Sequence, residues 1–266
     1  MIPGLRSALQ VEALLLRRSV VLLIAVPVLV VLVPCASFGT VALARSGHGD
    51  GAAAAKLAPY ATGDPETTMM VALAQILSVA VLTAGGFATA SAFGQPFTDG
   101  TAGASFGLTV PRTTIALARC LVVLTSLAAV VLAATLVGLV LAALAGATLA
   151  TGRPSTSSGL GQATVTAFTA GMLGIGLALP FGWVATVTRS AFGTVGVLIA
   201  VIAATQVIVL LGAGSWFPYA ASSLWTGMGG PEAAAAVGLP QLALTAAVGP
   251  VAVIAVVHAW QRLTDV

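Results

Sequence analysis

The residues of this chain that could do chemistry are few, and their spacing fits no common catalytic or metal site. Its one lysine, Lys56, does not end the glycine-rich GxxxxGK[ST] pattern that cradles nucleotide phosphates. No HExxH pair is present, and the histidines and acids are too scattered to predict a metal cage. His258 stands alone in an apolar run, and Cys35 and Cys120 lie in separate ones. We therefore expect no catalytic residue, no metal and no cofactor, and the chain is not predicted to be an enzyme.

Polar residues nevertheless gather in one short insert between two long apolar runs. This stretch, FTDGTAGASFGLTVPRTTIALARC at 97–120, carries Asp99, Gly100-Thr101, the Pro111-Arg112 pair and Arg119. Asp and Thr side chains suit the first turn of a helix, whose backbone N–H groups they can accept from. Proline disfavours helix at the residue before it, so Pro111 would end such a helix. Taken alone, the pattern fits an ordinary cytosolic turn with a basic pair, in which these residues could also cap and end a short helix.

The elements around this insert are membrane spans. Of 266 residues, 59% are hydrophobic and only 6% charged, whereas soluble domains carry about 25% charged residues. A bilayer core needs about 20 apolar residues in a helix. The sequence therefore predicts an all-α integral membrane protein with one domain over 1–266. Six stretches qualify as spans: 19–44, 68–91, 114–141, 164–187, 190–212 and 241–260.

The basic residues of the short loops predict the orientation of these spans. With the N-terminus in the cytosol, seven arginines lie inside, at 6, 17, 18, 112, 119, 189 and 262, and Arg45, Lys56 and Arg153 lie outside. We therefore expect both termini and the polar insert to be cytosolic. A composition rich in Ala, Val, Gly and Arg but poor in Lys is typical of a GC-rich bacterial genome. The expected location is a bacterial cell membrane.

The N-terminal segment, residues 1–18, is predicted to be an amphipathic helix lying on the cytosolic leaflet. Its polar side carries Arg17 and Arg18 with Arg6, and its opposite side is rich in Leu and Ala. Glu12 falls inside the apolar arc. Two interpretations remain open for it: the side chain snorkels to water at the helix edge, or it meets a cationic partner on another element or subunit. We expect Arg119 and Arg112 at the lipid headgroups or against a partner protein.

Three further features bear on how the spans pack. Residues 213–240 are too apolar for a solvated loop and too broken by Gly and Pro for a span, which predicts a re-entrant or interfacial hairpin on the outer face. Gly138, Ala142 and Gly146 recur at four-residue intervals and favour close helix packing, within the chain or between two copies. Gln75 and Gln206 are the strongly polar residues at the span centres, where amides commonly bridge helices.

Taken with the insert and the entry helix, this topology resembles the permease subunit of a type-2 ATP-binding-cassette (ABC) exporter. The family insert usually reads as an acid, Gly-Thr, hydrophobic residues, Pro and Arg, then a basic residue that opens span three. The resemblance rests here on VEALLLRRS at 11–19 and on the insert. The corresponding insert residues are Asp99, Gly100, Thr101, Phe106, Leu108, Pro111, Arg112 and Arg119. Asp99 and Arg119 stand where the family often has Glu and Lys.

The resemblance implies that the insert is a cytosolic coupling helix that docks on a separate ATPase subunit, which binds the ATP. Glu12, Arg17 and Arg18 would belong to the entry helix. The six spans would form the translocation path together with those of a second permease copy or paralogue. Two other classes of function stay open: an autonomous carrier or channel, and a non-transporting assembly or immunity protein. Carriers usually keep ionisable groups at membrane depth, and the predicted span centres hold none.

Overall fold

The computed structural model describes residues 4–47, 52–103, 110–149 and 159–263. These residues form helices and connecting turns, with no β-strand among them. Six of the helical segments in this part of the chain are long and apolar enough to cross a membrane. The prediction of an all-α membrane protein with six candidate spans is confirmed at this level.

The six candidate spans match the predicted ones, and two of them are much longer than predicted. The first, Val20–Ser46, joins α2 (Val20–Pro27), a π-helical stretch η1 (Val28–Leu32) and α3 (Val33–Ser46). The second and third are α5 (Pro65–Thr98) and α7 (Arg112–Leu149). The fourth, Leu160–Thr188, joins α8 (Leu160–Ala178) and α9 (Pro180–Thr188). The last two are α10 (Ala191–Leu210) and α13 (Leu239–Gln261).

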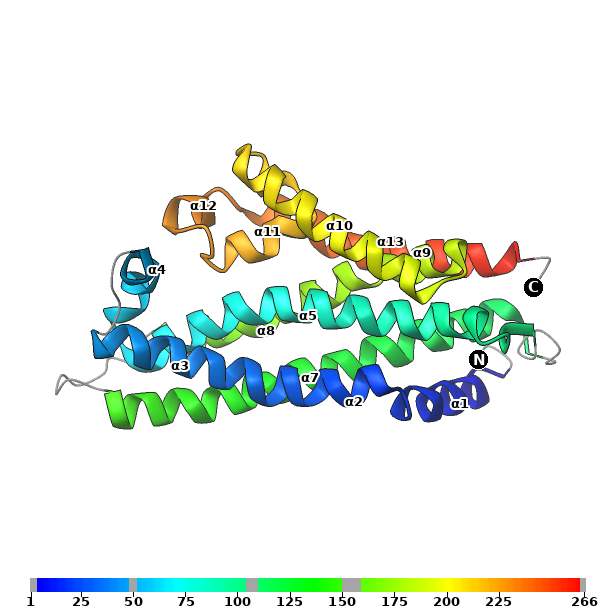
Figure 1. The fold of residues 1–266 in the computed structure, drawn as a ribbon, viewed down its shortest axis with the longest axis horizontal. Helices are drawn as coiled ribbons and strands as arrows, with labels where there is room; N and C mark the ends of the chain where they lie inside the picture. The colour runs from blue at the N-terminus through cyan, green and yellow to red at the C-terminus, as the bar shows by residue number, and fades with distance from the viewer. Residues whose placement is uncertain (1–3, 48–51, 104–109, 150–158, 264–266) are drawn as a thin grey trace.

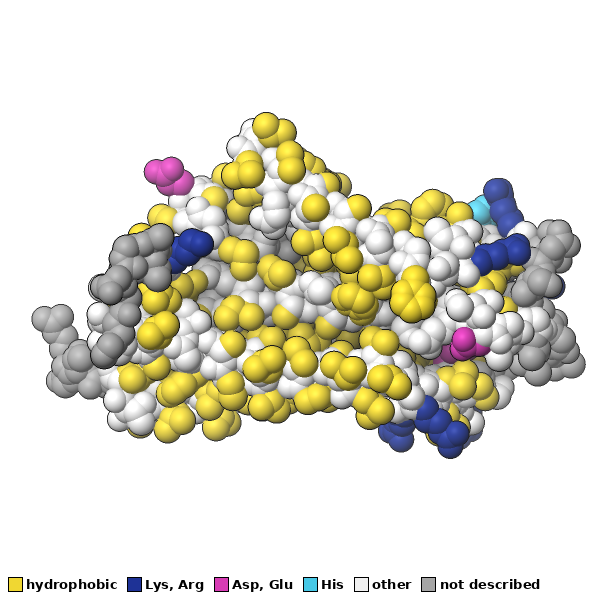
Figure 2. All heavy atoms as spheres, viewed as in Figure 1, with side chains coloured by type: hydrophobic (Ala, Val, Ile, Leu, Met, Phe, Trp, Pro, Cys, Tyr) yellow, Lys and Arg dark blue, Asp and Glu magenta, His cyan; other side chains and the backbone are white. Residues whose placement is uncertain are grey.

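The remaining helices are short. They are α1 (Leu5–Arg17), α4 (Ala52–Ala61), the 3-10 turn η3 (Gly214–Trp216), α11 (Pro218–Trp225) and α12 (Pro231–Ala235). Both termini lie at one end of the elongated bundle, together with α1, while α4, α11 and α12 lie at the other (Figure 1). Charged side chains are seen towards the two ends, and the length between them is hydrophobic or uncharged (Figure 2). This distribution is that of a protein that crosses a bilayer along its long axis.

Helix α5 is the centre of the bundle, and small residues allow its neighbours to approach closely. It packs against α7, α8, α9 and α10. A Cβ atom on Gly138 would come within 2.3 Å of a Leu73 methyl group, and one on Gly146 within 2.2 Å of the Glu66 carboxylate. Ala142, between them, is buried. The small-residue row of α7 therefore packs against α5 inside the chain. Of the two interpretations of this row, packing within the chain is the one observed.

The first span changes its hydrogen-bond pattern where two prolines interrupt it. Pro27 and Pro34 carry no backbone N–H, so each removes one helical hydrogen bond. Between them the chain adopts the π-helical stretch η1, in which the N–H of Val33 donates to the carbonyl of Val28. A π-helical turn of this kind accommodates an extra residue and lets the helix bend without ending.

Residues 213–240 are neither a span nor an open loop, as predicted from their composition. They fold into η3, α11 and α12, with Ala220 and Ala221 buried. Gln75, in the middle of α5, links this segment to the span, since its Nε2 donates to the Thr226 carbonyl at 3.1 Å. The Tyr60 hydroxyl donates to the same amide, and burial raises the pKa of Tyr60, which keeps it a donor. The predicted bridging role is confirmed for Gln75, whereas Gln206 is exposed.

We predict that Gly94→Ala destabilises the bundle more than any exposed glycine substitution. A Cβ atom at Gly94 would lie 2.5 Å from the Ala191 backbone nitrogen, so α5 would have to move away from the start of α10. Such overpacking typically costs about 1–3 kcal/mol. Gly39→Ala is the matched control, because nothing lies within 4 Å of its Cβ position and alanine favours helix by up to about 1 kcal/mol. Unfolding in mixed detergent micelles, followed by circular dichroism, should separate the two variants; equal stabilities would contradict the prediction.

Candidate functional site

A buried ion pair joins the N-terminal helix to the third span. Along α1, Ala8, Glu12 and Leu16 are buried, and a four-residue spacing places them on one face of the helix, which packs on α7. Arg119 donates from Nε to one Glu12 carboxylate oxygen at 2.8 Å and from Nη2 to the other at 2.7 Å. The side chains of the two residues are 5% and 9% exposed. Of the two interpretations of Glu12, the cationic partner is correct and the snorkelling side chain is wrong.

The expectation that Arg119 lies against a partner protein is wrong, whereas its expected depth at the level of the lipid headgroups stays a prediction. Its guanidinium lies inside the protein, where the ring centroids of Trp260 and Phe93 are 5.2 Å and 5.7 Å from its Cζ atom. The faces of aromatic rings attract cations, which offsets part of the cost of burying this charge. Nη1 is buried and has no hydrogen-bond partner among the described residues. The bidentate geometry and the flanking rings explain why arginine, with its planar guanidinium, occupies this position.

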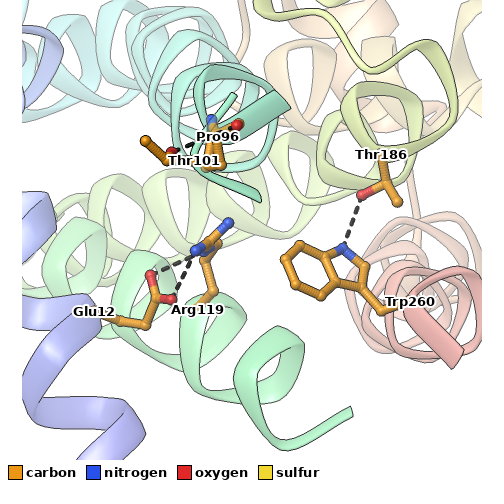
Figure 3. A network of polar contacts seen from close by, with 6 residues as sticks. All are labelled: Glu12, Pro96, Thr101, Arg119, Thr186 and Trp260. Atoms are coloured by element: carbon orange, nitrogen blue, oxygen red, sulfur yellow. Dashed lines mark hydrogen bonds and ion pairs between the residues drawn. The ribbon is translucent and has the colours of Figure 1, made fainter. Parts of the chain in front are cut away.

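The aromatic residues extend the network to the two spans that end nearby. The Trp260 Nε1 donates to the Thr186 hydroxyl at 3.1 Å, and the Trp260 ring packs edge-on against Phe93. Figure 3 shows Glu12 and Arg119 pointing toward one another, with the Trp260 ring on the far side of the guanidinium. One cluster thus ties together α1, α5, α7, α9 and α13. The aromatic part of this cluster was not predicted from the sequence. The sequence does place Phe93, Arg119 and Trp260 near the predicted cytosolic ends of their spans.

A pocket of about 230 Å³ opens beside the ion pair and is lined by residues from both stretches singled out in the sequence. The entry helix and the residue after it contribute Glu12 and Arg18, and the end of α5 and the insert contribute Gln95, Asp99 and Thr101. Arg119 lines the pocket as well. The two charged stretches, about ninety residues apart in sequence by their numbering, therefore meet at one place. Arg17, at the end of α1, is exposed.

The first residues of the insert turn the chain out of α5. Asp99 directly follows α5 as its C-cap, with its N–H donating to the Gln95 carbonyl, so it ends span two rather than beginning a separate helix. Gly100 has a φ of +68°, a left-handed conformation that suits glycine. The Thr101 hydroxyl donates weakly to the Pro96 carbonyl at 3.4 Å, as drawn in Figure 3. Residues 102 and 103 are helical, and Phe106 and Leu108 lie outside the described residues.

The end of the insert leads directly into the third span. Pro111 precedes α7, and its carbonyl accepts from the N–H groups of Thr114 and Ile115. Arg112 is the first residue of α7 and donates from Nη1 to the Leu263 carbonyl, just past the end of α13. Because α5 leads into the insert and α7 leads out of it, a displacement of the insert would act on both helices. Arg112 in addition connects the insert to the sixth span.

No group of three or more His, Cys, Asp or Glu residues in the described part of the chain could hold a metal ion. In comparison with known proteins, the chain matches no family model, and no curated protein matches its sequence.

Proposed function

We propose that this chain is the membrane-spanning subunit of an ATP-driven exporter, coupled to a separate ATPase subunit of the ABC type. The observation that supports it best is the meeting of the entry helix and the insert around the Glu12–Arg119 pair. The resemblance to type-2 permeases rests on these same two stretches. The ion pair attaches α1 to the helix that leads out of the insert, so a force on the insert would act on α1 as well as on α7.

The lengths of α5 and α7 fit such a role. At 1.5 Å per residue, 34 and 38 residues give helices of about 51 Å and 57 Å. The hydrocarbon core is about 30 Å thick, so both helices extend well beyond it unless strongly tilted. Arg119 is seven residues, or about 10 Å, into α7, so the ion pair lies in the extended part. A push on the insert would reach the spans through two rigid helices braced by α1.

The end of the bundle that carries α1 and both termini is proposed to face the cytosol of a bacterium. Seven of the ten basic residues belong to this end by the topology inferred from the sequence, and basic residues favour the cytosolic side. Helix α1 would then lie at the inner leaflet, with Val11 and Leu15 exposed toward lipid and Arg6 and Arg17 toward water. The segment containing α11 and α12 would form the outer hairpin before the last span.

The second subunit of the proposed dimer is assigned to the exposed face of α10. Gly196, Ala200 and Ala204 recur at four-residue intervals and are all exposed, and such small residues allow two helices to approach closely in a membrane. Gln206 is exposed on the same helix. At 100° per residue Gln206 lies about 120° around the helix from Ala200, so its amide is not part of this small-residue face.

The proposal predicts that the purified chain hydrolyses no ATP by itself and that an ATPase subunit accompanies it from native membranes in mild detergent. The sequence has no Walker A motif to bind the phosphates, so hydrolysis must come from a partner. The measurement is ATP turnover of the affinity-purified chain before and after removal of co-purifying proteins. Turnover that remains with the isolated chain, or transport by the isolated chain in vesicles without ATP, would contradict the proposal.

A further inference from the structure

Two adjoining hollows run between α9 and α13, and Thr186, which accepts a hydrogen bond from Trp260 of the Glu12–Arg119 cluster, lines the first of them. The first lies at the end of both helices, and its lining includes Arg189, His258 and Arg262. None of the described residues that line it is acidic. A histidine lies beside Lys or Arg side chains at this end of the bundle in Figure 2. All three basic residues are exposed, so they can reach a ligand from the membrane surface.

The second hollow is an apolar groove that continues from the first toward the middle of the bundle. Leu244, Val248 and Val251 of α13 line it together with Pro180 at the start of α9. Trp183 and Ala255 line both hollows, so the basic end and the apolar groove are continuous. Trp183, Leu244 and Val251 are 44%, 45% and 63% exposed. The groove is therefore open to the hydrocarbon along its length and charged only at one end.

The groove spans the middle of α13. Its α13 residues run from Leu244 to Ala255, eleven residues or about 16 Å at 1.5 Å per residue, and the midpoint of α13 (Leu239–Gln261) falls among them. An acyl chain in the groove would therefore run from the basic residues at the end of α13 to the middle of the helix and beyond it.

The backbone at Arg189 also marks this end of the groove. Arg189 has a φ of +52° and is the single non-glycine residue with positive φ in the described part of the chain. This conformation costs roughly 1–2 kcal/mol for residues other than glycine. Glycine would fit this position, which caps the end of α9, with less strain. The arginine that stands here in place of glycine lines the first hollow beside α13.

We propose that this composite hollow binds one anionic phospholipid, with its phosphate among Arg189, His258 and Arg262 and one acyl chain along the groove past Trp183. Arginine N–H groups pair with phosphate oxygens in a two-pronged geometry, and basic pockets between membrane helices are suited to anionic headgroups. Two full positive charges favour a lipid with net negative charge over a zwitterionic one, whose own cation would be repelled. This site adjoins the Glu12–Arg119 cluster at Thr186, and it does not depend on the proposed transport function.

The test measures quenching of Trp183 fluorescence by lipids brominated on their acyl chains. The chain is reconstituted in phosphatidylcholine vesicles doped with brominated phosphatidylglycerol or brominated phosphatidylcholine, and the signal of a Trp183→Phe variant is subtracted. We expect half-maximal quenching at a several-fold lower mole fraction of the anionic lipid. Ala255→Phe, which fills the junction of the two hollows, should reduce quenching by that lipid to the level of the zwitterionic one.

Charge variants test whether Arg189 and Arg262 cause the preference for the anionic lipid. Arg189→Asn with Arg262→Gln should abolish it, and asparagine tolerates the left-handed backbone. Arg17→Gln with Arg18→Gln removes the same charge from the same end of the bundle and should leave it unchanged; elution profile and circular dichroism show whether each variant is folded. Equal quenching by both lipids overturns the proposal, as does an equal loss in the control pair. If millimolar inorganic phosphate removes the preference, the site binds free phosphate and the lipid assignment fails.

Discussion

Arg119→Ala should lower the free energy of unfolding by about 3–5 kcal/mol and release α1 from the bundle. Removing one partner of a buried ion pair leaves the other charge buried without compensation, and this is the typical cost. Glu12 is 8% exposed and would become that uncompensated charge. Arg18 lines the same pocket, but Glu12 and Arg119 make the one salt bridge found among the described residues.

Two measurements check this result. The first is unfolding in mixed micelles, compared with Arg119→Lys, which keeps the charge but loses the two-pronged geometry and the stacking on Trp260. The second uses a single cysteine in place of Ala8, which is buried against the bundle, with Cys35 and Cys120 replaced by alanine. The thiol should react slowly with a soluble maleimide when Arg119 is present and rapidly in Arg119→Ala. A destabilisation below about 1 kcal/mol with unchanged labelling would contradict the structural role of the pair.

The double variant Glu12→Leu with Arg119→Met distinguishes a lost interaction from a buried unpaired charge. Apolar residues of similar size often replace buried ion pairs with little loss of stability. We expect the double variant to be more stable than either single variant, because each single change leaves one charge unpaired and the double change leaves none. Additive costs would instead mean that the two side chains contribute independently.

The membrane class of this protein follows from composition, whereas the cluster around Glu12 and Arg119 could not be predicted from it. Long apolar runs predict spans because a bilayer offers no partner for backbone groups, so each crossing must be a helix. The position of Glu12, an acid within the apolar arc of an amphipathic helix, indicated that it could meet a cationic partner. Its partner could not be chosen among seven arginines of the same end, because the contact between residues 107 positions apart depends on how α1 packs on the spans.

The ends of α5 and α7 show a second limit of the sequence. Hydropathy placed the end of span two at Ser91, yet α5 continues to Thr98 through Gly94 and Pro96. Residues such as these lower helix propensity by up to about 3 kcal/mol each, and packing outweighs that local preference. Gly94 instead fits against the start of α10, and Phe93 packs on Trp260. Only the tertiary contacts make the glycine a packing residue rather than a helix end.

Asp99→Lys should leave the fold intact and abolish coupling to the ATPase subunit, if the insert carries force as proposed. Asp99 is exposed, and exposed substitutions usually change stability by less than about 0.5 kcal/mol. It also stands at the carboxyl end of α5, where the helix dipole favours a cation over an acid. The lysine variant is therefore expected to be as stable as the parent, or slightly more so, and to insert normally. Any loss of activity could then be assigned to the contact that the insert makes.

Gly100 offers a matched pair of variants for the same test. Proline fixes φ near −65°, against the +68° that Gly100 adopts, and removes the N–H that donates to the Phe97 carbonyl. Gly100→Pro should therefore redirect the insert, whereas Gly100→Asn, which tolerates the left-handed conformation, should preserve it. Glu232→Lys is the charge control, since it reverses an exposed acid on α12, at the opposite end of the bundle.

The measurement is the amount of ATPase subunit that co-purifies with each variant in mild detergent, together with the ATP turnover of the complex. We expect Asp99→Lys and Gly100→Pro to lower both at least several-fold at equal expression, and Gly100→Asn and Glu232→Lys to leave both near the parent values. If Asp99→Lys alone associates normally with the ATPase subunit, Asp99 is not part of the docking contact, although the rest of the insert still is. Normal association and turnover in both Asp99→Lys and Gly100→Pro would mean that residues 97–112 are a simple connection, because neither its charge nor its direction would then matter to the partner.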